Sequence, residues 1–462
     1  DSAVECCEEN AIIKAIAPHC VEPCGGLFVA VEGDDLVFAT KFPELCKAAG
    51  IPCEPVSIEQ ALLEEPLLSE KLIRVFRVQD ATVDPFHLAL ENVTHARLLK
   101  KGEYRPHTEL IGFEKKGDKL LYALCRDNRH GDVIKVKAEQ YVNAGGAWAM
   151  DIARIAGCND VHLLYSKGTL LVSHDRLSGQ VINRLRTPGD GDILVPGGTV
   201  SILGTTSDRT ESLQDIRPTV EEIDRNVLEA TKMIPALTET RYIRAFARIR
   251  PLLQSVKSAS DRASTRGFAL FDHLDQGIQN FCTITGGKLT TYRLMAEKTS
   301  DLVAKRLRNT EPCTTHNTPL PNASTSSWTQ PGVSPKRWYQ DSNSDDLILC
   351  ECEMVPTSAI VAITNNSPGA EKEMTLEAIA LRSRAGKGPC QGSFCGIRIG
   401  SHLYDNGFYQ DRKGLQHMRD FFNERFRGMR PIIWGSQAAQ LELAEALHRG
   451  LLCLDQLEND QD

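Results

Sequence analysis

Two turns with paired glycines, each set between a strand-like run and a helix-like run, constrain the fold of this chain more than any other feature. The first lies in residues 140–148 (Gln-Tyr-Val-Asn-Ala-Gly-Gly-Ala-Trp) and the second in residues 281–293 (Phe-Cys-Thr-Ile-Thr-Gly-Gly-Lys-Leu-Thr-Thr-Tyr-Arg). Glycine lets the backbone turn sharply and lets a ligand approach it at the start of a helix. Two such turns predict an α/β fold with a ligand site at the ends of its strands.

Short runs beside and between these turns predict further strands and one long helix. Six runs have the pattern of strands, namely 110–113, 120–125, 133–136, 168–173, 193–196 and 200–206. The first three are separated by turn residues and predict an antiparallel meander, whereas the other three predict a mixed sheet with a helix at 219–233. We therefore expect an α/β (α+β) chain in which a mixed-sheet substrate domain is inserted into a Rossmann-like nucleotide domain.

Length and charge exclude several classes of protein. The chain has 462 residues, more than one core usually supports, and a formal net charge of −8, which disfavours binding to nucleic-acid phosphates. It contains no run of about 18 apolar residues and no basic-then-apolar signal, so any membrane contact is expected to be peripheral. The 15 cysteines are scattered and odd in number, which fits a reducing cytosol better than a secreted disulfide framework.

Four cysteines form the strongest chemical signal because they stand as two close pairs. Cys350 and Cys352 form the first pair, and Cys390 and Cys395 form the second within a glycine-rich stretch. Glycine allows tight loops with backbone N–H groups near sulfur, so four thiolates can converge on one metal centre. Zinc sites usually have two-residue gaps, and a disulfide does not suit the inferred compartment. The spacing favours an iron–sulfur cluster, with zinc, a disulfide or chance as the alternatives.

Two groups of basic residues suit an anionic ligand. Lys288 and Arg293 follow the second glycine pair, where unpaired N–H groups and the helix dipole favour an anion such as a reduced flavin ring. Arg248 and Arg250 project from one side of an extended segment that leads into Pro251, and arginine binds phosphate or carboxylate through two hydrogen bonds. The alternatives are a packing turn with solvated basic residues and, for Arg248, a surface ion pair. Arg250 is the better candidate for an anion ligand.

These motifs, in this order, resemble the FAD-dependent glycerol-3-phosphate dehydrogenases, and among them the large catalytic subunit of the anaerobic, multi-subunit type. The resemblance covers almost the whole chain and lies in the runs 19–23, 26–28, 80–85, 143–148, 167–168, 193–197, 204–207, 250–252 and 286–293. The C-terminal cysteine region resembles the 2Fe-2S domain of the bacterioferritin-associated-ferredoxin type. The resemblance thus implies FAD and a 2Fe-2S cluster as cofactors.

The resemblance also implies roles for individual residues. It places against FAD the residues Asn143, Ala144, Gly145, Gly146, Trp148, Gly286, Gly287, Lys288, Leu289 and Thr290. It places in the substrate cavity Lys167, Thr205, Thr206, Arg250 and Arg293. Arg250 would hold the substrate phosphate, and Arg250 and Lys288 would act as catalytic electrostatic groups. The cluster ligands would be Cys350, Cys352, Cys390 and Cys395. These motifs do not identify a catalytic base.

The implied activity is oxidation of sn-glycerol 3-phosphate to dihydroxyacetone phosphate, with electrons passing through FAD and the cluster to partner subunits and a membrane quinone. The implied location is cytoplasmic, at the inner face of the cell membrane through those partners. Two other functions stay open: an amino-acid or opine oxidase-type dehydrogenase with the same cysteine layout, and a non-catalytic iron–sulfur scaffold. The run 286–293 argues against the first of these.

The chain departs from the family pattern in two places. A flavin domain of this kind has a Gly-x-Gly-x-x-Gly turn after its first strand and an acidic residue for the ribose, and neither occurs here. Because the chain opens at Asp1 inside a helical pattern carrying Ile13 and Ile16, we expect the first βαβ unit to lie upstream and the Rossmann-like domain here to be incomplete. Arg248 stands where the family usually has a small residue, which would reinforce phosphate binding or narrow the substrate range.

The expected domains follow from these motifs and from a change in composition. An FAD-dependent oxidoreductase domain spans 1–311, with FAD-binding parts at 1–25, 76–160 and 265–311 and substrate-domain parts at 26–75 and 161–264. A linker rich in Ser, Thr, Asn and Pro spans 312–346, and the 2Fe-2S domain spans 347–401. A helical tail at 402–462 carries a stripe of Leu443, Leu447, Leu451 and Leu454, which we expect to pack against its own domain rather than to dock a partner.

Overall fold

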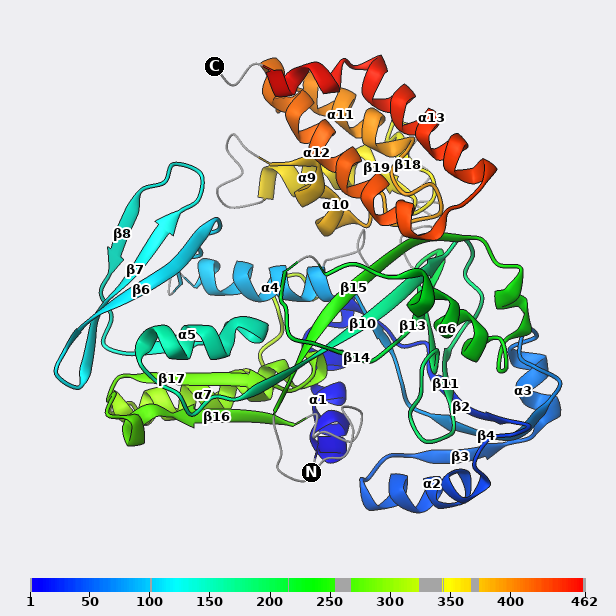
Figure 1. The fold of residues 1–462 in the computed structure, drawn as a ribbon, viewed down its shortest axis with the longest axis horizontal. Helices are drawn as coiled ribbons and strands as arrows, with labels where there is room; N and C mark the ends of the chain where they lie inside the picture. The colour runs from blue at the N-terminus through cyan, green and yellow to red at the C-terminus, as the bar shows by residue number, and fades with distance from the viewer. Residues whose placement is uncertain are drawn as a thin grey trace.

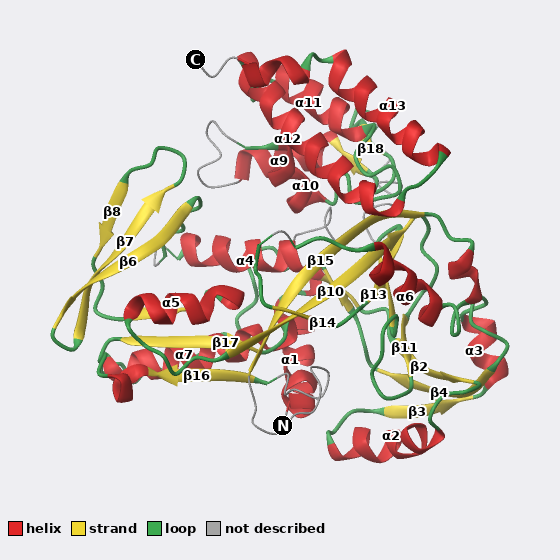
Figure 2. Ribbon diagram, in the orientation of Figure 1, coloured by secondary structure: helices red, strands yellow, loops and turns green. Residues whose placement is uncertain are grey.

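The computed structural model describes residues 2–99, 102–214, 216–253, 267–323, 343, 345–366 and 374–459. Residues 324–342 and 344 of the predicted linker lie outside the described residues. Helices and strands are mixed through the first two thirds of the chain, and the region after residue 345 is mostly helical (Figure 2). The expected α/β (α+β) class is confirmed.

A nine-stranded mixed sheet occupies the centre of the molecule (Figure 1). Its order is β14-β10-β13-β12-β11-β2-β4-β3, and β15 also pairs with β10. The strands are β2 (Gly26–Val31), β3 (Cys53–Val56), β4 (Leu72–Val78), β10 (Leu163–Ser173), β11 (Val181–Arg184), β12 (Ile193–Gly197), β13 (Val200–Gly204), β14 (Asp208–Thr210) and β15 (Tyr242–Leu253). The long antiparallel pair β10–β15 places Ser166 opposite Arg250, and this register decides which side chains share a face.

Three helices accompany this sheet, namely α2 (Leu36–Ala48), α3 (Ile58–Glu64) and α6 (Val220–Ala230). Helix α6 begins with a capping box in which Thr219 and Glu222 satisfy each other's backbone N–H groups. It packs on β10 and β13, where its buried Ile223 and Ala230 join the apolar core of the sheet. Both the sheet and the helix predicted between the two glycine turns are therefore present.

A second, three-stranded sheet carries the two glycine turns. Its order is β16-β17-β9, with β9 (Tyr141–Asn143), β16 (Phe268–Asp272) and β17 (Phe281–Gly286). Helices α5 (Ala149–Ala156) and α7 (Tyr292–Arg306) follow β9 and β17 after the 3-10 turns η2 (Gly146–Trp148) and η5 (Leu289–Thr291). The predicted meander is also confirmed, as β6 (Thr108–Lys116), β7 (Lys119–Asp127) and β8 (Val133–Val136).

The first residues of the chain lie beside the helix α4 (Pro85–Leu98). Helix α1 (Ser2–Ile16) leads through η1 (Pro18–Cys20) into β1 (Val21–Glu22), which pairs with β5 (Thr82–Val83) just before α4. Asp84 caps α4 by accepting hydrogen bonds from the backbone N–H groups of Phe86 and His87, both at 3.1 Å. The pairing of β1 with β5 therefore fixes the first turn of α4 beside η1.

The C-terminal region has a core of its own and stacks above the large sheet in Figure 1. Its elements are β18 (Ile348–Cys350), β19 (Val355–Pro356), α9 (Thr357–Asn366), α10 (Leu376–Ser383), α11 (Cys395–Asp405), α12 (Asp411–Met429), α13 (Ser436–Leu451) and η7 (Leu454–Asn459). Phe421, Phe422 and Phe426 on one face of α12 are buried in this core. Helix α12 also contacts β15, so the two regions touch directly.

The expectation that the leucine stripe of the tail packs against its own domain was wrong. Leu443, Leu447 and Leu451 are 61%, 62% and 73% exposed, so this stripe of α13 faces away from its own domain. Leu454 lies beyond the helix and is buried, because the chain turns back into the core there. In α5 the buried face consists of alanines, while Trp148 before the helix is 58% exposed. Small side chains let α5 approach the sheet closely, which periodicity alone does not reveal.

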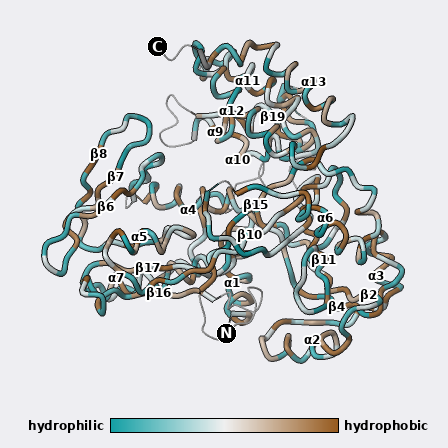
Figure 3. The backbone as a smooth tube through the Cα atoms, in the orientation of Figure 1, coloured by the Kyte–Doolittle hydropathy of each residue, from teal (hydrophilic) through white to brown (hydrophobic). Residues whose placement is uncertain are grey.

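Hydrophobic residues are interleaved with hydrophilic ones along the helices (Figure 3). Within the described part of the chain, no helix combines the length and the hydrophobicity that crossing a membrane requires.

Candidate functional site

The two glycine turns lie side by side. Strand β9 runs parallel to β17 with Asn143 opposite Thr283, so both turns stand at the carboxyl ends of neighbouring strands. Asn143 Nδ2 donates to Thr283 Oγ1 at 3.1 Å, and Thr285 Oγ1 donates to Gly146 O at 3.3 Å. The carboxyl ends of parallel strands are where α/β folds bind ligands, because the helix N-termini converge there. The structure thus joins two motifs that are far apart in the sequence.

The glycines of the second turn are required by the space around them. Gly286 and Gly287 have φ of +83° and +72°. A Cβ on Gly286 would lie 2.7 Å from the Gly267 carbonyl oxygen, and one on Gly287 would lie 2.5 Å from Met295 Sδ. In the first turn, by contrast, a Cβ on Gly146 would meet nothing within 4 Å, so this turn is open on that side. The second turn is closed by its own packing, whereas the first is closed at Gly145, which packs on Ile152, and open at Gly146.

An apolar cavity of about 560 Å³ opens beside the two strands. Val142 and Ala144 line it from the first turn, Ile284 lines it from β17, and Met295 and Thr299 line it from α7. Cofactor sites are typically apolar cavities of this size with a few polar groups at one end. Each turn also carries one large apolar side chain exposed to solvent: Trp148 is 58% exposed and Leu289 is 45% exposed.

Arg250 is held in a fixed position on the large sheet. Its Nη2 donates to Thr205 Oγ1 at 2.8 Å, and its Nη1 donates to the Thr206 carbonyl oxygen at 3.2 Å and to Ser166 Oγ at 3.4 Å. Gly168 leaves room for it, since a Cβ there would clash with Nη2. The structure therefore brings Arg250, Thr205 and Thr206 together as predicted from the motifs.

Lys167 lies on the opposite face of β10. Ser166 and Gly168 face Arg250, and because side chains alternate along a strand, Lys167 faces α6. Its Nζ lies 3.0 Å from Glu222 Oε1. The structure does not bring Lys167 to Arg250, and a role for Lys167 in the substrate cavity stays a prediction.

Arg248 shares the face of Arg250 but has a different environment. It is exposed, and its guanidinium lies over the Phe246 ring at 5.3 Å from the centroid. It borders a cavity of about 900 Å³ between β15 and the helices α12 and α13. The two arginines are thus one strand repeat apart but differ in their immediate surroundings.

The basic residues of the second turn contact helix α1. Lys288 is exposed, and its Nζ lies 3.5 Å from Cys6 Sγ. Arg293 is buried, and its Nε and Nη2 donate to the two carboxylate oxygens of Glu9 at 2.9 Å and 2.5 Å, while Nη1 pairs with Glu297. Arg293 therefore joins α1 to α7, and its predicted place in the substrate cavity stays a prediction.

The four predicted cysteine ligands converge. Cys395 Sγ is within hydrogen-bonding reach of both Cys350 and Cys390, and Cys390 is within reach of Cys352. Backbone N–H groups also point at the sulfurs, those of Glu353 and Gly386 at Cys350. The hydrogen bond with Cys395 lowers the pKa of Cys390 to about 5. A group of thiols with these donors suits an anionic metal centre, because metals bind thiolates.

Arg425 adds a cation to this group. Its Nε and Nη2 are buried without a hydrogen-bond partner in the described part of the chain, and burial lowers its pKa to about 9. Its guanidinium lies beside the loop between the second pair of cysteines, since a Cβ on Gly392 would be 3.5 Å from Nε. A buried guanidinium without an acceptor is unfavourable, so the thiols and Arg425 together fit an anionic cluster such as 2Fe-2S.

A buried network of charges joins the loop at residues 384–394, which carries Cys390 and is called the cysteine loop below, to the rest of the chain. Lys387 Nζ donates to Asp84 Oδ2 at 3.0 Å, and Arg384 lies 3.7 Å from the same oxygen. Arg384 Nε also donates to Glu353 Oε2 at 2.9 Å, and Thr199 Oγ1 donates to Glu353 Oε1 at 2.6 Å. Asp84, Glu353 and Arg384 are all less than one tenth exposed. The network holds the cysteine loop against α4 and the large sheet.

Comparison with known proteins shows the family to which the chain belongs. The family described as FAD dependent oxidoreductase matches residues 3–302. The A-subunit of the anaerobic glycerol-3-phosphate dehydrogenase of Escherichia coli (strain K12) is 35% identical, over 100% of this chain and 88% of that protein. The A1-subunit of the same enzyme from Haloferax volcanii is 33% identical, over 98% of this chain and 81% of that protein. The chain belongs to the family of anaerobic glycerol-3-phosphate dehydrogenase A-subunits.

A solved structure shows the same fold. The glycerol-3-phosphate dehydrogenase from Bacillus halodurans complexed with FAD superposes with a TM-score of 0.62 at 19% identity, covering 93% of this chain and 86% of that one. As a family member, the present chain is an FAD-dependent oxidoreductase. Its residues fit the cofactor, since the open turn at Gly146, the apolar cavity and the cationic Lys288 suit a flat, anion-forming ring.

Several functional residues were not found from the sequence. The local sequence indicates a turn at Asp84 and solvated loop positions at Lys387 and Arg384. Arg425 lies in a helix rich in charged residues, where an arginine is usually exposed. The only signal for Arg425 was its place one turn from Phe421 and Phe422, on the buried side of α12.

Proposed function

We propose that the protein oxidises sn-glycerol 3-phosphate to dihydroxyacetone phosphate and passes the electrons to partner subunits and a quinone. The observation that carries this proposal is the similarity to the A-subunit of the anaerobic glycerol-3-phosphate dehydrogenase along the whole chain. The preorganised Arg250 site supports it, because the substrate of such an enzyme carries a phosphate dianion.

Arg250 would bind the phosphate, and Thr205 would hold the Arg250 guanidinium in place. Arg250 presents a planar fork whose position is set by Thr205, Thr206 and Ser166 before any substrate arrives. The Arg250 side chain then needs little reorganisation when the substrate binds. This favours a substrate held in one orientation. The exposed Arg248 lies on the same strand face and would widen the cationic surface around this point.

The two glycine turns would hold the flavin. Bound FAD supplies a two-electron acceptor for the substrate carbon. Asn143, Gly146, Gly286 and Thr290 would contact it through backbone and amide groups, and Lys288 would place a positive charge near the ring. That charge favours the electron-rich form that develops during the reaction.

The cysteine region would provide the exit for electrons. Cys350, Cys352, Cys390 and Cys395 would ligate a 2Fe-2S cluster, which supplies a one-electron carrier when bound. The exposed leucines of α13 would dock a partner protein, since three large apolar side chains on one helix face are costly to leave in water. Through such partners the protein would work in the cytoplasm at the inner face of the membrane.

The test is a visible spectrum of the protein, produced from its complete gene and purified anaerobically, before and after addition of glycerol 3-phosphate. We expect the flavin bands to bleach and an underlying iron–sulfur shoulder to persist. Glycerol at the same concentration is the control and should cause no bleaching, because it lacks the phosphate that Arg250 binds. If the flavin stays oxidised with glycerol 3-phosphate but bleaches with an amino acid such as proline, the proposed substrate is wrong.

A further inference from the structure

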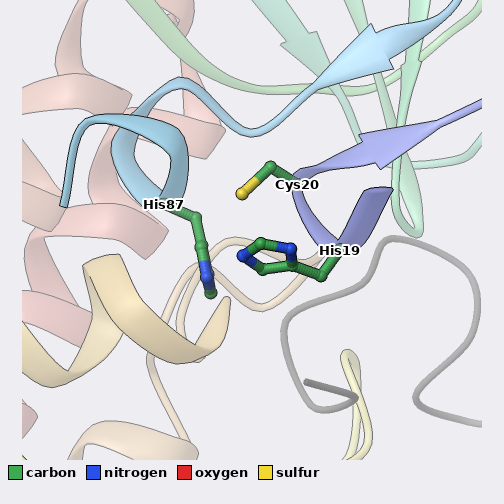
Figure 4. A group of neighbouring side chains, drawn as sticks. All are labelled: His19, Cys20 and His87. Atoms are coloured by element: carbon green, nitrogen blue, oxygen red, sulfur yellow. The ribbon is translucent and has the colours of Figure 1, made fainter. Parts of the chain in front are cut away.

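Three metal-ligating side chains meet in the core between η1 and α4. His19 and Cys20 come from η1 and His87 comes from the first turn of α4, and their side chains point toward one another (Figure 4). One nitrogen of each ring and Cys20 Sγ all lie within 4.8 Å of one another. His19 and Cys20 are fully buried, and His87 is 8% exposed. A tetrahedral zinc ion separates its nitrogen and sulfur ligands by roughly 3.5 Å, so small side-chain rotations would close this group around an ion.

The imidazoles are oriented in the way that metal sites require. Glu91 Oε2 lies 3.1 Å from His19 Nε2, and Glu91 Oε1 lies 3.6 Å from His87 Nε2. Asn322 in turn donates to Glu91 through its backbone N–H and its Nδ2, at 3.2 Å and 2.7 Å. A carboxylate on one ring nitrogen fixes the imidazole so that the other nitrogen can bind a metal. The Nδ1 atoms of His19 and His87 are both buried, and neither has a hydrogen-bond partner in the described part of the chain.

A second group of similar composition shows what such residues look like when they need no ion. Cys158, Asp160 and His273 also lie within 4.8 Å of one another. There, however, both ring nitrogens of His273 have partners: Nδ1 is 3.2 Å from Asp160 Oδ2, and Nε2 is 2.8 Å from Thr283 Oγ1. Both ring nitrogens of His273 are therefore satisfied within the protein. Among the described residues, the His19 group leaves three buried ring nitrogens without a hydrogen-bond partner, namely His19 Nδ1 and both nitrogens of His87, and such groups in native structures usually have a partner.

We propose that His19, Cys20 and His87 bind a Zn²⁺ ion, with Glu91 as the carboxylate that orients the His19 imidazole and lies beside that of His87. Zinc is the divalent ion that best suits mixed nitrogen and thiolate ligands in a tetrahedral arrangement. Burial, together with the charges of Glu91 and Asp84, raises the pKa of the Cys20 thiol, so the cysteine is protonated when no ion is present. Binding therefore forms a Zn–S bond and releases the thiol proton to solvent, while the imidazoles bind in their neutral form.

The ion would have a structural role at the junction of the two regions. It would tie η1 to the first turn of α4, where the backbone N–H of Asp84 already donates to Cys20 O at 2.9 Å. Asp84 is the carboxylate that holds Lys387 of the cysteine loop. Zinc at this point would thus fix the element on which the cysteine region is docked. This role is independent of the proposed activity.

The test is the zinc and iron content of the anaerobically purified full-length protein. We expect about one zinc per chain in addition to the iron of the cluster. The variants Cys20→Ala and His87→Phe should each lower the zinc content at least fivefold. Cys46→Ala, which removes another buried cysteine, is the matched control and should leave it unchanged. Zinc that persists in both site variants would overturn the proposal.

X-ray absorption at the zinc edge of the unmutated protein makes the test independent of whether the variants fold. We expect a first shell with two nitrogen ligands and one sulfur, completed by a nitrogen or oxygen. A shell of four sulfurs would show that zinc occupies the other cysteines instead, and would overturn the proposal. Protein that holds less than a tenth of an equivalent of zinc after dialysis against Zn²⁺ would overturn it as well.

Discussion

The Arg250 site and the four-cysteine site differ in whether protein atoms satisfy their charged side chains. Arg250 is held by Thr205, Thr206 and Ser166 in the structure as it stands, so the protein itself sets its position. In the cysteine site the thiols contact mainly one another, and Arg425 has two buried nitrogens without an acceptor in the described part of the chain. Under the proposed function, the site for the substrate is complete before binding, whereas the site for the resident cluster is completed by the cluster.

The largest effect is expected from removing one cysteine. Cys390→Ala should abolish the cluster, because two loops close around four thiolates and three do not satisfy two irons. The iron and sulfide content and the electron paramagnetic resonance signal of the reduced protein measure this. Cys453→Ala, at an exposed cysteine, is the control and should keep the full signal. An intact signal in Cys390→Ala would show that the cluster does not require Cys390 as a ligand.

The next largest effect is expected at Arg250. Arg250→Leu should lower kcat/KM for glycerol 3-phosphate by roughly 150- to 900-fold, since two charge-assisted hydrogen bonds are worth about 3–4 kcal/mol. Flavin content and cluster signal should not change. Arg248→Leu is the matched control, two residues away on the same strand face, and should cost less than about tenfold. Equal losses for both variants would mean that the phosphate is bound by a diffuse cationic surface rather than by one prepared arginine.

The network between the two regions should be sensitive to pH. Burial opposes ionisation of Asp84, but Lys387 and then Arg384 outweigh it and lower the pKa of this carboxyl below its usual value. Its contribution is therefore present above the unfolded-state pKa of about 3.9 and is lost as pH falls toward the folded-state value.

Asp84→Asn tests this network, because asparagine keeps the helix cap and removes only the charge. We expect the variant to lower the free energy of unfolding by roughly 3 kcal/mol at pH 7. The difference between the two proteins should shrink toward pH 3. Denaturant midpoints at several pH values measure it, and a difference that does not depend on pH would contradict the assignment of the effect to this charge.

The smallest effect is expected at Arg425. Arg425→Met should lower the reduction potential of the cluster by about 60 mV, a tenfold change for a one-electron couple, because a nearby cation stabilises the more negative reduced form. Redox titration followed by electron paramagnetic resonance measures the shift. Arg427→Met, on the exposed side of the same helix with a side chain 67% exposed, is the control and should shift it by less than about 15 mV. An unchanged reduction potential in Arg425→Met would show that the Arg425 guanidinium is not part of the cofactor site.

Much of the candidate site followed from local sequence alone. The paired glycines predicted both strand-to-helix turns, because only glycine adopts the positive φ seen at Gly286 and Gly287 without strain. The close pairs of cysteines predicted a four-thiol site, and the structure brings the four together. The six strand-like runs at 110–206 also became strands, since a period of two residues is encoded in neighbouring side chains.

The partner of each charged side chain depends on tertiary packing. The register of β10 and β15 put Ser166 beside Arg250 and turned Lys167 away, and the approach of α1 to α7 gave Arg293 to Glu9. These outcomes join residues far apart in the chain, and a local pattern carries no information on such pairs. Local patterns sufficed for the turns, the close pairs of cysteines and the class of fold, whereas the charges that are satisfied within the protein depend on how distant segments pack together.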